Sequence, residues 1–321
     1  MADAILGSTS GGSGITKLSN QILTAYQQTA FFALREGLVF DQFASVKPGN
    51  MTSPGDVVSF LLWSDMSVAS TSLDEGVDVA SRTLSDSTVT VTPNEYGDAV
   101  ILTLRLRADD FLIGFDSNVA NLLNFGMVNT IDFLAEAAIT GGTNVRYGGL
   151  SESHTAADDI DATGILAVVR IREARAQLRG DSSLPWDGSN YGSVIHPDAA
   201  FDVKEESGDA GWATTATYSD ATRVWNDEIG LFANVRFIES PRALLTADGA
   251  SGNVDAYTTY FFGQQFLAKA ETIPPHMVLG PVTDKLRRFQ PLGWHFYAGW
   301  DTFREASLRR IVSASSIGSN S

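Results

Sequence analysis

The residues best suited to metal or proton chemistry in this 321-residue chain are four histidines and a short acidic loop. Residues 159–164, Asp-Ile-Asp-Ala-Thr-Gly, begin like a calcium-binding loop, but Arg170 stands at the twelfth position, where a bidentate glutamate is needed. The histidines form no His-Glu-x-x-His or other paired ligand spacing; they are His154, His196, His276 and His295. We therefore expect that the histidines are not metal ligands. The one metal site that the sequence leaves undecided is a calcium site near Asp159.

Motifs for a nucleophile or a cofactor are equally sparse. The glycine-rich stretches around Gly141 and Gly148 do not form G-x-G-x-x-G after a strand, and the chain has no G-x-x-x-x-G-K-[ST] loop for phosphate. Residues 7–11 carry Thr9 where a nucleophile elbow needs serine, and the lack of cysteine excludes disulfides and thiolate metal sites. The sequence therefore predicts no catalytic residues and no cofactor. A Ser-His-Asp triad assembled only by folding, in a soluble α+β hydrolase, is the competing interpretation.

The overall charge and hydropathy narrow the classes of partner. The formal net charge is −16, from 38 acidic and 22 basic residues, which argues against a surface devoted to phosphate backbones. The first 14 residues contain Asp3 where a signal peptide needs a basic region, so we expect no export signal. The longest apolar runs fall far short of the roughly 18 residues of a membrane helix, so we expect no contact with a membrane.

Two segments of opposite charge could attract one another. Residues 57–98 carry seven acidic residues and one basic residue, a net of −6, whereas residues 276–321 carry six basic and three acidic residues, a net of +3. Opposite charges of this kind favour a contact, which could join separate copies of the chain. The predicted contact residues are Asp74, Glu75, Asp78 and Arg82 in the first segment and Arg287, Arg288, Arg304, Arg309 and Arg310 in the second.

The element that must organise the chain is a long amphipathic helix over residues 116–142. Asp116 or Ser117 can cap its start, and Gly141 with Gly142 can end it. About 24 helical residues would span roughly 36 Å, well beyond the usual globular helix of about 11 or 12. The apolar and small residues recur with helical spacing; they are Val119, Leu122, Leu123, Gly126, Met127, Thr130, Ile131, Leu134, Ala137 and Ala138.

A hairpin arm is predicted before this helix. Residues 57–63 form a short apolar run of strand type, residues 87–92 alternate strictly, and residues 100–106 place apolar side chains on one side of a further strand. Between the first two strands lie more than 20 residues rich in Ser, Thr and Asp. Because a loop of that length inside a compact domain is generally functional, we expect an arm that projects toward a partner.

The remaining segments predict a mixed α/β body and a C-terminal group of strands. Residues 1–14 read as a flexible arm and residues 18–35 as an amphipathic helix. Residues 191–206 predict a strand and a helix, and residues 230–241 a strand with a turn at Ser240 and Pro241. Two strands are expected around Gly299, with a third ending at Val312. A helix near residues 165–179 is predicted to bury Ile165, Leu166, Val169 and Leu178 and to expose Arg170, Arg172, Arg175 and Arg179.

This order of elements resembles the major capsid proteins of tailed bacteriophages, which have the Hong Kong 97 type fold. The resemblance is carried by the acidic loop with Glu75-Gly76, the alternating strand and the Tyr96-Gly97 step ahead of the long helix. Further similarity lies in residues 230–241 and in the closing GWHFYAGWDTFREASLRRIVSASS. It covers about residues 20–315, but residues 104–107 depart from the Thr-Asp that often follows the Tyr-Gly strand, so the start of the helix is less firmly placed.

The resemblance implies an α+β fold with a long spine helix, an extended β-hairpin loop, and peripheral and axial domains. The implied boundaries are residues 1–50 for the N-terminal arm and helix, 51–100 for the extended loop, 101–145 with 271–321 for the peripheral domain, and 146–270 for the axial domain. The implied function is that of a major capsid protein, which self-assembles into an icosahedral head around phage double-stranded DNA, without catalysis.

The implied partners are other copies of the chain, as pentamers and hexamers, with scaffold, portal and decoration proteins as further candidates and non-specific contact with packaged DNA. The implied location is the virion capsid, assembled in the host cytoplasm. Some members of this fold join an arm lysine to a neighbour by an isopeptide bond, but residues 57–107 contain no lysine. The alternatives are an encapsulin-like cellular shell, a tail-tube or decoration protein, and the hydrolase.

Overall fold

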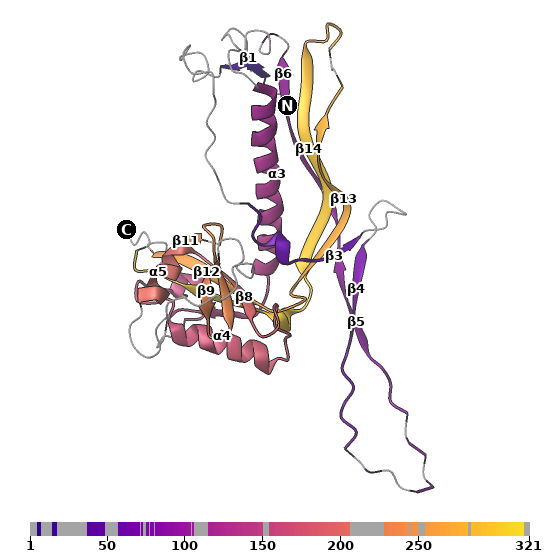
Figure 1. Cartoon of the computed structure of the whole chain (residues 1–321), viewed down its shortest axis with the longest axis vertical. Coiled ribbons are helices and arrows are strands. Elements are labelled where there is room, and N and C mark those ends of the chain that lie inside the picture. The colour runs from indigo at the N-terminus through magenta and orange to yellow at the C-terminus, as the bar shows by residue number, and fades with distance from the viewer. Residues whose placement is uncertain are drawn as a thin grey trace.

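The computed structural model is elongated, with a long helix and a tall sheet above a compact α/β body and a hairpin that projects away from both (Figure 1). The fold has the mixed helix and sheet character predicted for it. The structure describes residues 5–7, 15–17, 37–48, 57–70, 72, 75–76, 78–79, 81–103, 105, 115–149, 154–205, 228–243, 245–249, 254–281 and 284–317. The helix predicted over residues 18–35 lies outside the described residues.

The long helix α3 runs from Phe115–Thr140 and packs lengthwise on a six-stranded sheet (Figure 1). Its bounds confirm the prediction over residues 116–142. The sheet order is β2-β1-β6-β14-β13-β3, with β14 antiparallel to both β6 and β13. Its strands are β1 (Ile5–Gly7), β2 (Ile15–Lys17), β3 (Ser45–Pro48), β6 (Asn94–Thr103), β13 (Leu267–Leu279) and β14 (Phe289–Thr302).

The buried face of α3 differs in part from the predicted one. Leu123, Met127 and Ile131 are buried against Trp294 and Phe296 of β14, as the helical spacing predicts. Leu122, predicted to be buried, is instead 63% exposed, and Ala137 is also exposed. The face was misplaced because the helix buries two carboxylates, Asp132 and Glu136, which a hydrophobic pattern assigns to solvent.

Part of α3, Asn118–Thr140, has the length and hydropathy of a membrane-crossing helix. The prediction that no apolar stretch approaches that length therefore needs correction. In this structure the same stretch packs along β14 and carries the buried Asp132 and Glu136, as the core helix of a folded domain does.

Buried polar contacts fix the segment before the hairpin to α3 and to the tall sheet. The backbone N–H groups of Val39 and Phe40 donate to Asp132 Oδ1, at 3.0 and 2.7 Å. Next to them the 3-10 helix η1 (Asp41–Phe43) offers the carboxylate of Asp41 to Lys269 Nζ and Trp300 Nε1. Because each donor is satisfied in a buried setting, this connection is held in one position.

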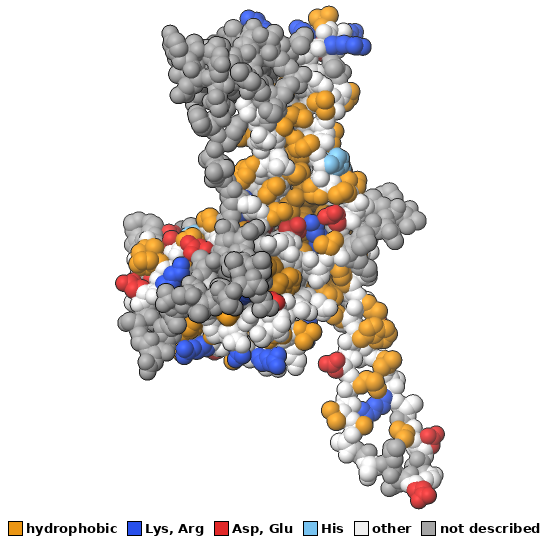
Figure 2. All heavy atoms as spheres, viewed as in Figure 1, with side chains coloured by type: hydrophobic (Ala, Val, Ile, Leu, Met, Phe, Trp, Pro, Cys, Tyr) orange, Lys and Arg blue, Asp and Glu red, His pale blue; other side chains and the backbone are white. Residues whose placement is uncertain are grey.

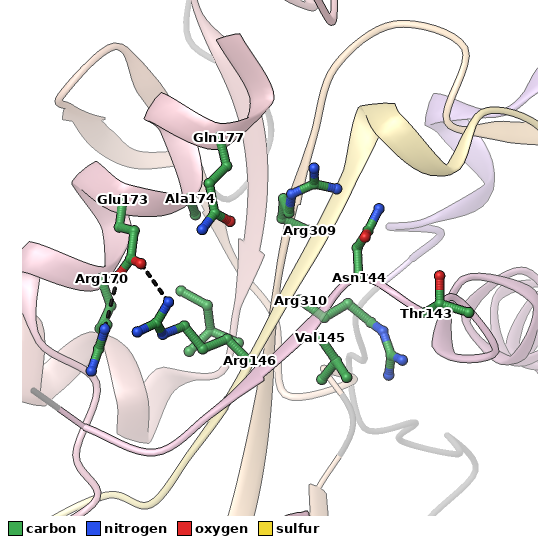
Figure 3. Close-up of a pocket in the computed structure, with 11 residues that line it drawn as sticks. Thr143, Asn144, Val145, Arg146, Arg170, Glu173, Ala174, Gln177, Arg309 and Arg310 are labelled. Atoms are coloured by element: carbon green, nitrogen blue, oxygen red, sulfur yellow. Dashed lines mark hydrogen bonds and ion pairs between the residues drawn. The ribbon is translucent and has the colours of Figure 1, made fainter. Parts of the chain in front are cut away.

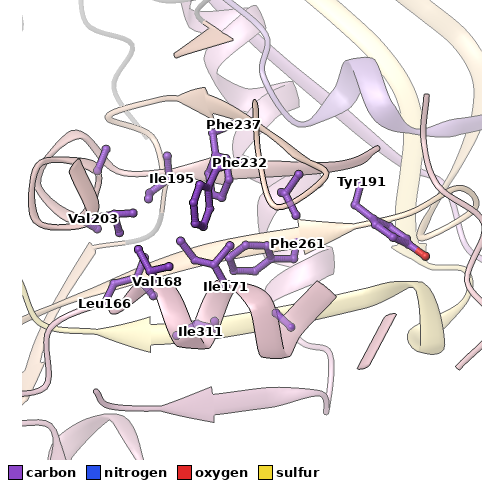
Figure 4. Packing of buried hydrophobic residues seen from close by; sticks show 14 of the residues in the cluster. Leu166, Val168, Ile171, Tyr191, Ile195, Val203, Phe232, Phe237, Phe261 and Ile311 are labelled. Carbon is purple, nitrogen blue, oxygen red and sulfur yellow. The ribbon is translucent and has the colours of Figure 1, made fainter. Parts of the chain in front are cut away.

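In the described part of the α/β body, a seven-stranded sheet is accompanied by the helices α4 and α5. Its strand order is β7-β15-β12-β8-β10-β9, with β11 paired to β12. Helix α4 (Val168–Gly180) packs on it through Val168 and Ile171, together with Leu166 just before the helix, beside Phe261 and Ile311 of the sheet (Figure 4). The other elements are β7 (Val145–Tyr147), η2 (Ala157–Asp159), β8 (Tyr191–Ile195), α5 (Pro197–Glu205), β9 (Glu228–Phe232), β10 (Val235–Glu239), β11 (Leu245–Gly249), β12 (Val254–Phe262), η4 (Glu305–Ser307) and β15 (Leu308–Ser313).

The strand and helix predicted over residues 191–206 are confirmed by β8 and α5. The predicted inner face of α4 is wrong at two positions, since Val169 is exposed and Arg170 is buried. Arg170 is tolerated inside because its guanidinium donates twice to the carbonyl of Gly149 and pairs with Glu173. These hydrogen bonds and the ion pair offset the desolvation cost of the buried cation.

One of the two turns predicted in the C-terminal half was placed wrongly, and one hairpin turn was missed. Gly299 lies inside the continuous strand β14, where a side chain would come within 2.6 Å of the carbonyl oxygen of Thr92. That glycine marks a close backbone approach and no turn. The turn predicted at Ser240 and Pro241 is confirmed, since the N–H of Ala243 donates to the carbonyl oxygen of Ser240 at 3.3 Å. A further reversal, which the sequence analysis did not predict, falls at Ala233 and Asn234, both with positive φ, where β9 and β10 form a hairpin.

Residues 5–7 and 15–17, the first of which lies in the predicted flexible arm, form short parallel strands. β1 pairs with β2 and, through Ile5, with Ile101 of β6. This pairing extends the tall sheet at its β6 edge, which propensity alone could not reveal because the partner is nearly 100 residues away in sequence.

Candidate assembly surfaces

The hairpin predicted as a projecting arm is formed by β4 (Val58–Trp63) and β5 (Asp86–Val91), which pair antiparallel from Val58–Val91 to Trp63–Asp86. Its base is anchored because Phe60 and Val91 are buried with Ala268 and Ala270 of β13. Beyond Trp63 and Asp86 the chain continues away from the body as two separate extended segments (Figure 1). The structure therefore holds the arm at one end only.

Apolar side chains are the main feature of this arm in the isolated chain. Figure 2 shows hydrophobic side chains along its length and acidic side chains near its far end. Trp63 is 65% exposed and Val68 is 86% exposed. Exposed apolar residues in a series on one projecting element mark an interaction surface; they are Leu61, Trp63, Met66, Val68, Val79 and Leu84.

The predicted acidic contact residues lie at the tip. Glu75 and Asp78 are exposed, and Asp78 accepts a hydrogen bond from the N–H of Val79 at 2.8 Å. Arg82 donates to the backbone oxygen and the hydroxyl of Ser67, which joins the two sides of the arm. Asp74 lies outside the described residues. The sequence predicted the acids of this surface but not the exposure of its apolar residues. Leu61 and Trp63 lie in a strand that was predicted, and Met66, Val68, Val79 and Leu84 lie among polar residues without a helical or strand period.

The predicted basic contact residues fall into two separate groups. Arg287 and Arg288 lie in the turn between β13 and β14, where Arg288 Nε pairs with Asp284 at 2.9 Å. This turn lies at the far end of the tall sheet, opposite the hairpin tip (Figure 1). Arg309 and Arg310 lie in β15 of the α/β body, and Arg304 lies just before η4, which leads into that strand. Their contact with the arm of another copy stays a prediction.

The second basic group already has partners within the chain. Arg309 forms an ion pair with Asp181, and Arg304 donates to the backbone oxygen of the same residue at 3.4 Å. Arg310 donates to the backbone oxygen of Gly142, just beyond the end of α3. Burial lowers the pKa of Arg309 from its ordinary value, because a desolvated guanidinium is less favourable as a cation.

The acidic loop considered for calcium is satisfied by its own hydroxyls. Asp159 accepts from Thr155, and Asp161 accepts from the N–H and hydroxyl of Thr163, so hydrogen bonds lower the pKa of both carboxyl groups. Among the described residues no group of three or more His, Cys, Asp or Glu is arranged to hold a metal ion. His276 and His295 lie together, with ring centroids 5.5 Å apart, although nothing in their sequence spacing indicates it.

The elongated helix-and-sheet half, the α/β body and the projecting hairpin together form the capsid fold of tailed bacteriophages, the Hong Kong 97 type predicted above. The capsid of Ralstonia phage GP4 superposes with a TM-score of 0.70 at 16% identity, over 96% of this chain and 98% of that chain. The capsid of cyanophage P-SCSP1u gives 0.67 at 13% identity, over 94% and 95%. A capsid of a native gene transfer agent particle gives 0.59 at 15%, over 90% and 94%.

The sequence itself matches no family model and no curated protein. Because the identities are so low, the likeness is one of fold. It covers nearly the whole length of both chains.

Proposed function

We propose that this chain is a major capsid protein, which self-assembles into the icosahedral head that encloses phage double-stranded DNA. The observation that carries the proposal is the match of the fold to capsid chains over more than 90% of both partners. A shell subunit needs no catalytic site, and we propose none. The solved capsids named above belong to phages and to a gene transfer agent particle, which favours a phage-type head over a cellular cargo compartment.

Within this proposal, the domain boundaries implied by the resemblance follow the sheets. Residues 101–145 with 271–321 would form the peripheral domain around α3, and residues 146–270 the axial domain around α4 and β8. Residues 51–100 would form the extended loop, and residues 1–50 the N-terminal arm. The two sheets support these boundaries only in part, because most of β6 falls within residues 51–100 but pairs with β14 in the tall sheet. In addition, β15 joins the last residues of the chain to β12 in the sheet of the α/β body.

The hairpin would lie on a neighbouring copy in the shell. Its exposed apolar side chains, Trp63 and Val68 above all, would supply most of the free energy, because exposed ion pairs are individually worth only about 0–1 kcal/mol. The acids at the tip, Asp74, Glu75 and Asp78, would meet arginines of that copy and set the orientation. Because surface ion pairs are screened by salt, assembly should weaken as salt is added.

Other copies of the chain would be the principal partner, as pentamers and hexamers. Scaffold, portal and decoration proteins are proposed as further partners. Contact with DNA would be local and non-specific, since the chain carries a net charge of −16. The proposed location is the virion capsid, with assembly in the host cytoplasm.

Deletion of residues 67–85 tests the role of the hairpin. The deleted residues lie beyond the paired strands β4 and β5 and leave the anchored base of the arm in place. We expect the variant to fold with an unchanged thermal melt as a free subunit and to form no closed particles in electron micrographs. Trp63→Ser, which removes one exposed apolar side chain, should reduce the yield of particles.

Leu184→Ser is the matched control, because Leu184 is nearly as exposed as Trp63 but lies between helix α4 and strand β8 of the α/β body. It should assemble normally if the hairpin surface is specific. Closed particles of normal size from the deletion variant would show that the hairpin does not hold the shell together.

A further inference from the structure

A lysine, two carboxylates and an indole meet where the segment before the hairpin contacts the tall sheet. Lys269 of β13 is buried, and its Nζ lies 2.9 Å from Asp41 Oδ2 of η1 and 3.0 Å from Glu271 Oε2 of its own strand. Trp300 is paired in register with Lys269, and its Nε1–H donates to Asp41 Oδ1 at 2.8 Å. The amine also lies 5.4 Å from the centroid of that indole ring. The carboxylate of Asp41 is therefore held against an amine by one oxygen and against an N–H donor by the other.

The amine of Lys269 differs chemically from the other paired cations of this chain. In the pocket shown in Figure 3, Arg146 and Arg170 share the carboxylate of Glu173. A guanidinium stays protonated, so a pair of that kind can only remain ionic. A lysine amine becomes a nucleophile when it is desolvated and loses a proton. Among the described side chains, Lys269 is the only buried lysine.

Burial brings the reactants of an amide together at this point. The side chains of Lys269 and Asp41 are only 7% and 12% exposed. The attraction between two buried ions repays their lost hydration only in part. Transfer of one proton along the hydrogen bond from Nζ to Oδ2 gives an uncharged amine in contact with an uncharged carboxylic acid. Two groups held in contact in this way react far faster than the same groups free in solution.

We propose that Lys269 and Asp41 condense to an isopeptide bond within the chain, with Glu271 as the proton carrier. Nζ attacks Cγ of Asp41 and forms the C–N bond, while the π electron pair of the carbonyl moves onto Oδ1, where the N–H of Trp300 stabilises the negative charge. Glu271 accepts a proton from Nζ and passes it to the protonated Oδ2. The Cγ–Oδ2 bond then breaks and water leaves. The ammonium and carboxylate groups contain all the atoms of the amide and of one water, so the reaction needs no further reactant.

The bond would fix the position of the segment that precedes the hairpin. It would link η1 to β13 across 228 residues of sequence, and a cross-link over so long a loop restricts the unfolded chain strongly. Lys269 lies between Ala268 and Ala270, which pack against the base of the arm on the opposite face of the strand. Both linked residues belong to one chain, so the bond joins no copies to one another.

The mass of the full-length protein tests the proposal directly. Intact-mass spectrometry of the unfolded protein should give a mass lower than that of the sequence by one water molecule. In a tryptic digest, the peptides that contain Asp41 and Lys269 should be recovered as one branched species. Trypsin should not cut after Lys269, because its side chain would no longer be a free amine.

Three variants assign the loss of water to these residues. Lys269→Arg keeps a positive charge opposite Asp41 but supplies no amine, so it should have the full mass of its sequence. Glu271→Gln should be recovered mainly without the bond, since general acid–base catalysis contributes about a hundredfold or more to the rate. Lys204→Arg is the control, because Lys204 pairs with Glu239 at 3.5 Å on the surface, and it should lose water as the wild-type protein does.

A wild-type protein with the full mass of its sequence would overturn the proposal, because the pair would then be ionic. A deficit of one water in Lys269→Arg would equally overturn it, since the water would be lost elsewhere. Complete linkage in Glu271→Gln would remove that residue from the reaction. Circular dichroism checks that the variants fold, and the branched peptide of the wild-type protein decides the question if they do not. The masses do not depend on assembly, so the result is independent of the proposed function.

Discussion

At the scale of residues, the carboxylate of Asp132 shows how a charge can determine a fold. It sits on α3 at 2% exposure, accepts from the N–H groups of Val39 and Phe40, and forms an ion pair with Arg242 at 3.2 Å. The position of the chain before the hairpin therefore depends on one side chain of the long helix. Sequence patterns could not identify this role, because an Asp in an amphipathic helix is normally assigned to its solvated face.

Replacement of that carboxylate should be costly. In Asp132→Asn the side chain keeps one oxygen as an acceptor but loses the negative charge that pairs with Arg242. Its NH₂ group becomes a donor in a position where the neighbouring protein groups are also N–H donors. We expect the free energy of unfolding to fall by on the order of 2 kcal/mol in urea denaturation. Asp158→Asn, at an exposed position, is the control and should change little. Equal values for the two variants would contradict the anchoring role.

His196 should make stability depend on pH. Its Nδ1 accepts from the N–H of Asp198 at 3.2 Å, and burial lowers its pKa below the ordinary 6.5, although Asp198 and Glu239 oppose the shift. Below about pH 6.5 the unfolded chain therefore takes up this proton more readily than the folded chain, so stability falls as pH falls. The urea midpoint, measured at a series of pH values that decreases through about 6.5, should fall less in His196→Gln than in the wild-type protein. Parallel declines would exclude His196 as the cause.

At the scale of elements, the sequence predicted the helices and strands with strong local patterns and failed where distant contacts decide. The bounds of α3 and the pair β4 and β5 follow from periodicity and from the length of the loop between them. The face of α3 and the exposure of Val169 depend on which polar groups find buried partners, which a period cannot encode. Gly299 was misread as a turn because only the folded sheet brings the Thr92 carbonyl against it.

The corrected face of α3 gives a prediction on a single helix. Ile131 is 3% exposed and packs against β14, so Ile131→Ala should reduce the free energy of unfolding by about 2 to 5 kcal/mol. Leu122→Ala and Asn129→Ala, both at exposed positions on the same helix, should cost far less in the free subunit. Thermal melts of the three variants check this order. A large loss of stability in Leu122→Ala would show that Leu122 is buried, as the sequence analysis predicted.

Only part of the candidate contact surface could be predicted from the sequence. Charge counts identified the acidic tip at Glu75 and Asp78, and the structure leaves these side chains exposed. The arginines of the C-terminal segment look like one basic group in the sequence, but the long strand β14 separates them. Arg288 lies before it, in the turn at the far end of the tall sheet, and Arg309 lies after it, in β15 of the α/β body. The exposure of the apolar side chains along the arm could not be predicted from the sequence, because it depends on the folded body contacting the arm only at its base.

At the scale of the whole molecule, the chemistry of the arm bears on how a shell would be held together. The five lysines of the chain all lie outside residues 57–107. An arginine cannot replace an amine in an isopeptide bond, because its guanidinium stays protonated. Lys269 is buried and paired with Asp41 and Glu271. The lysines are Lys17, Lys47, Lys204, Lys269 and Lys285.

A shell of this protein should therefore be held by non-covalent contacts. Boiled particles on a denaturing gel should give one band near 34.4 kDa. A ladder of oligomers that survives boiling and reductant would show covalent cross-links and would exclude this account of the arm.

Self-assembly is the central claim, and electron microscopy of the purified full-length protein tests it most directly. The fold and the exposed hairpin predict closed particles with icosahedral symmetry, or the pentameric and hexameric rings from which they are built, and fewer of them as salt is raised. A protein that stays monomeric or dimeric at every concentration and salt condition would contradict the claim.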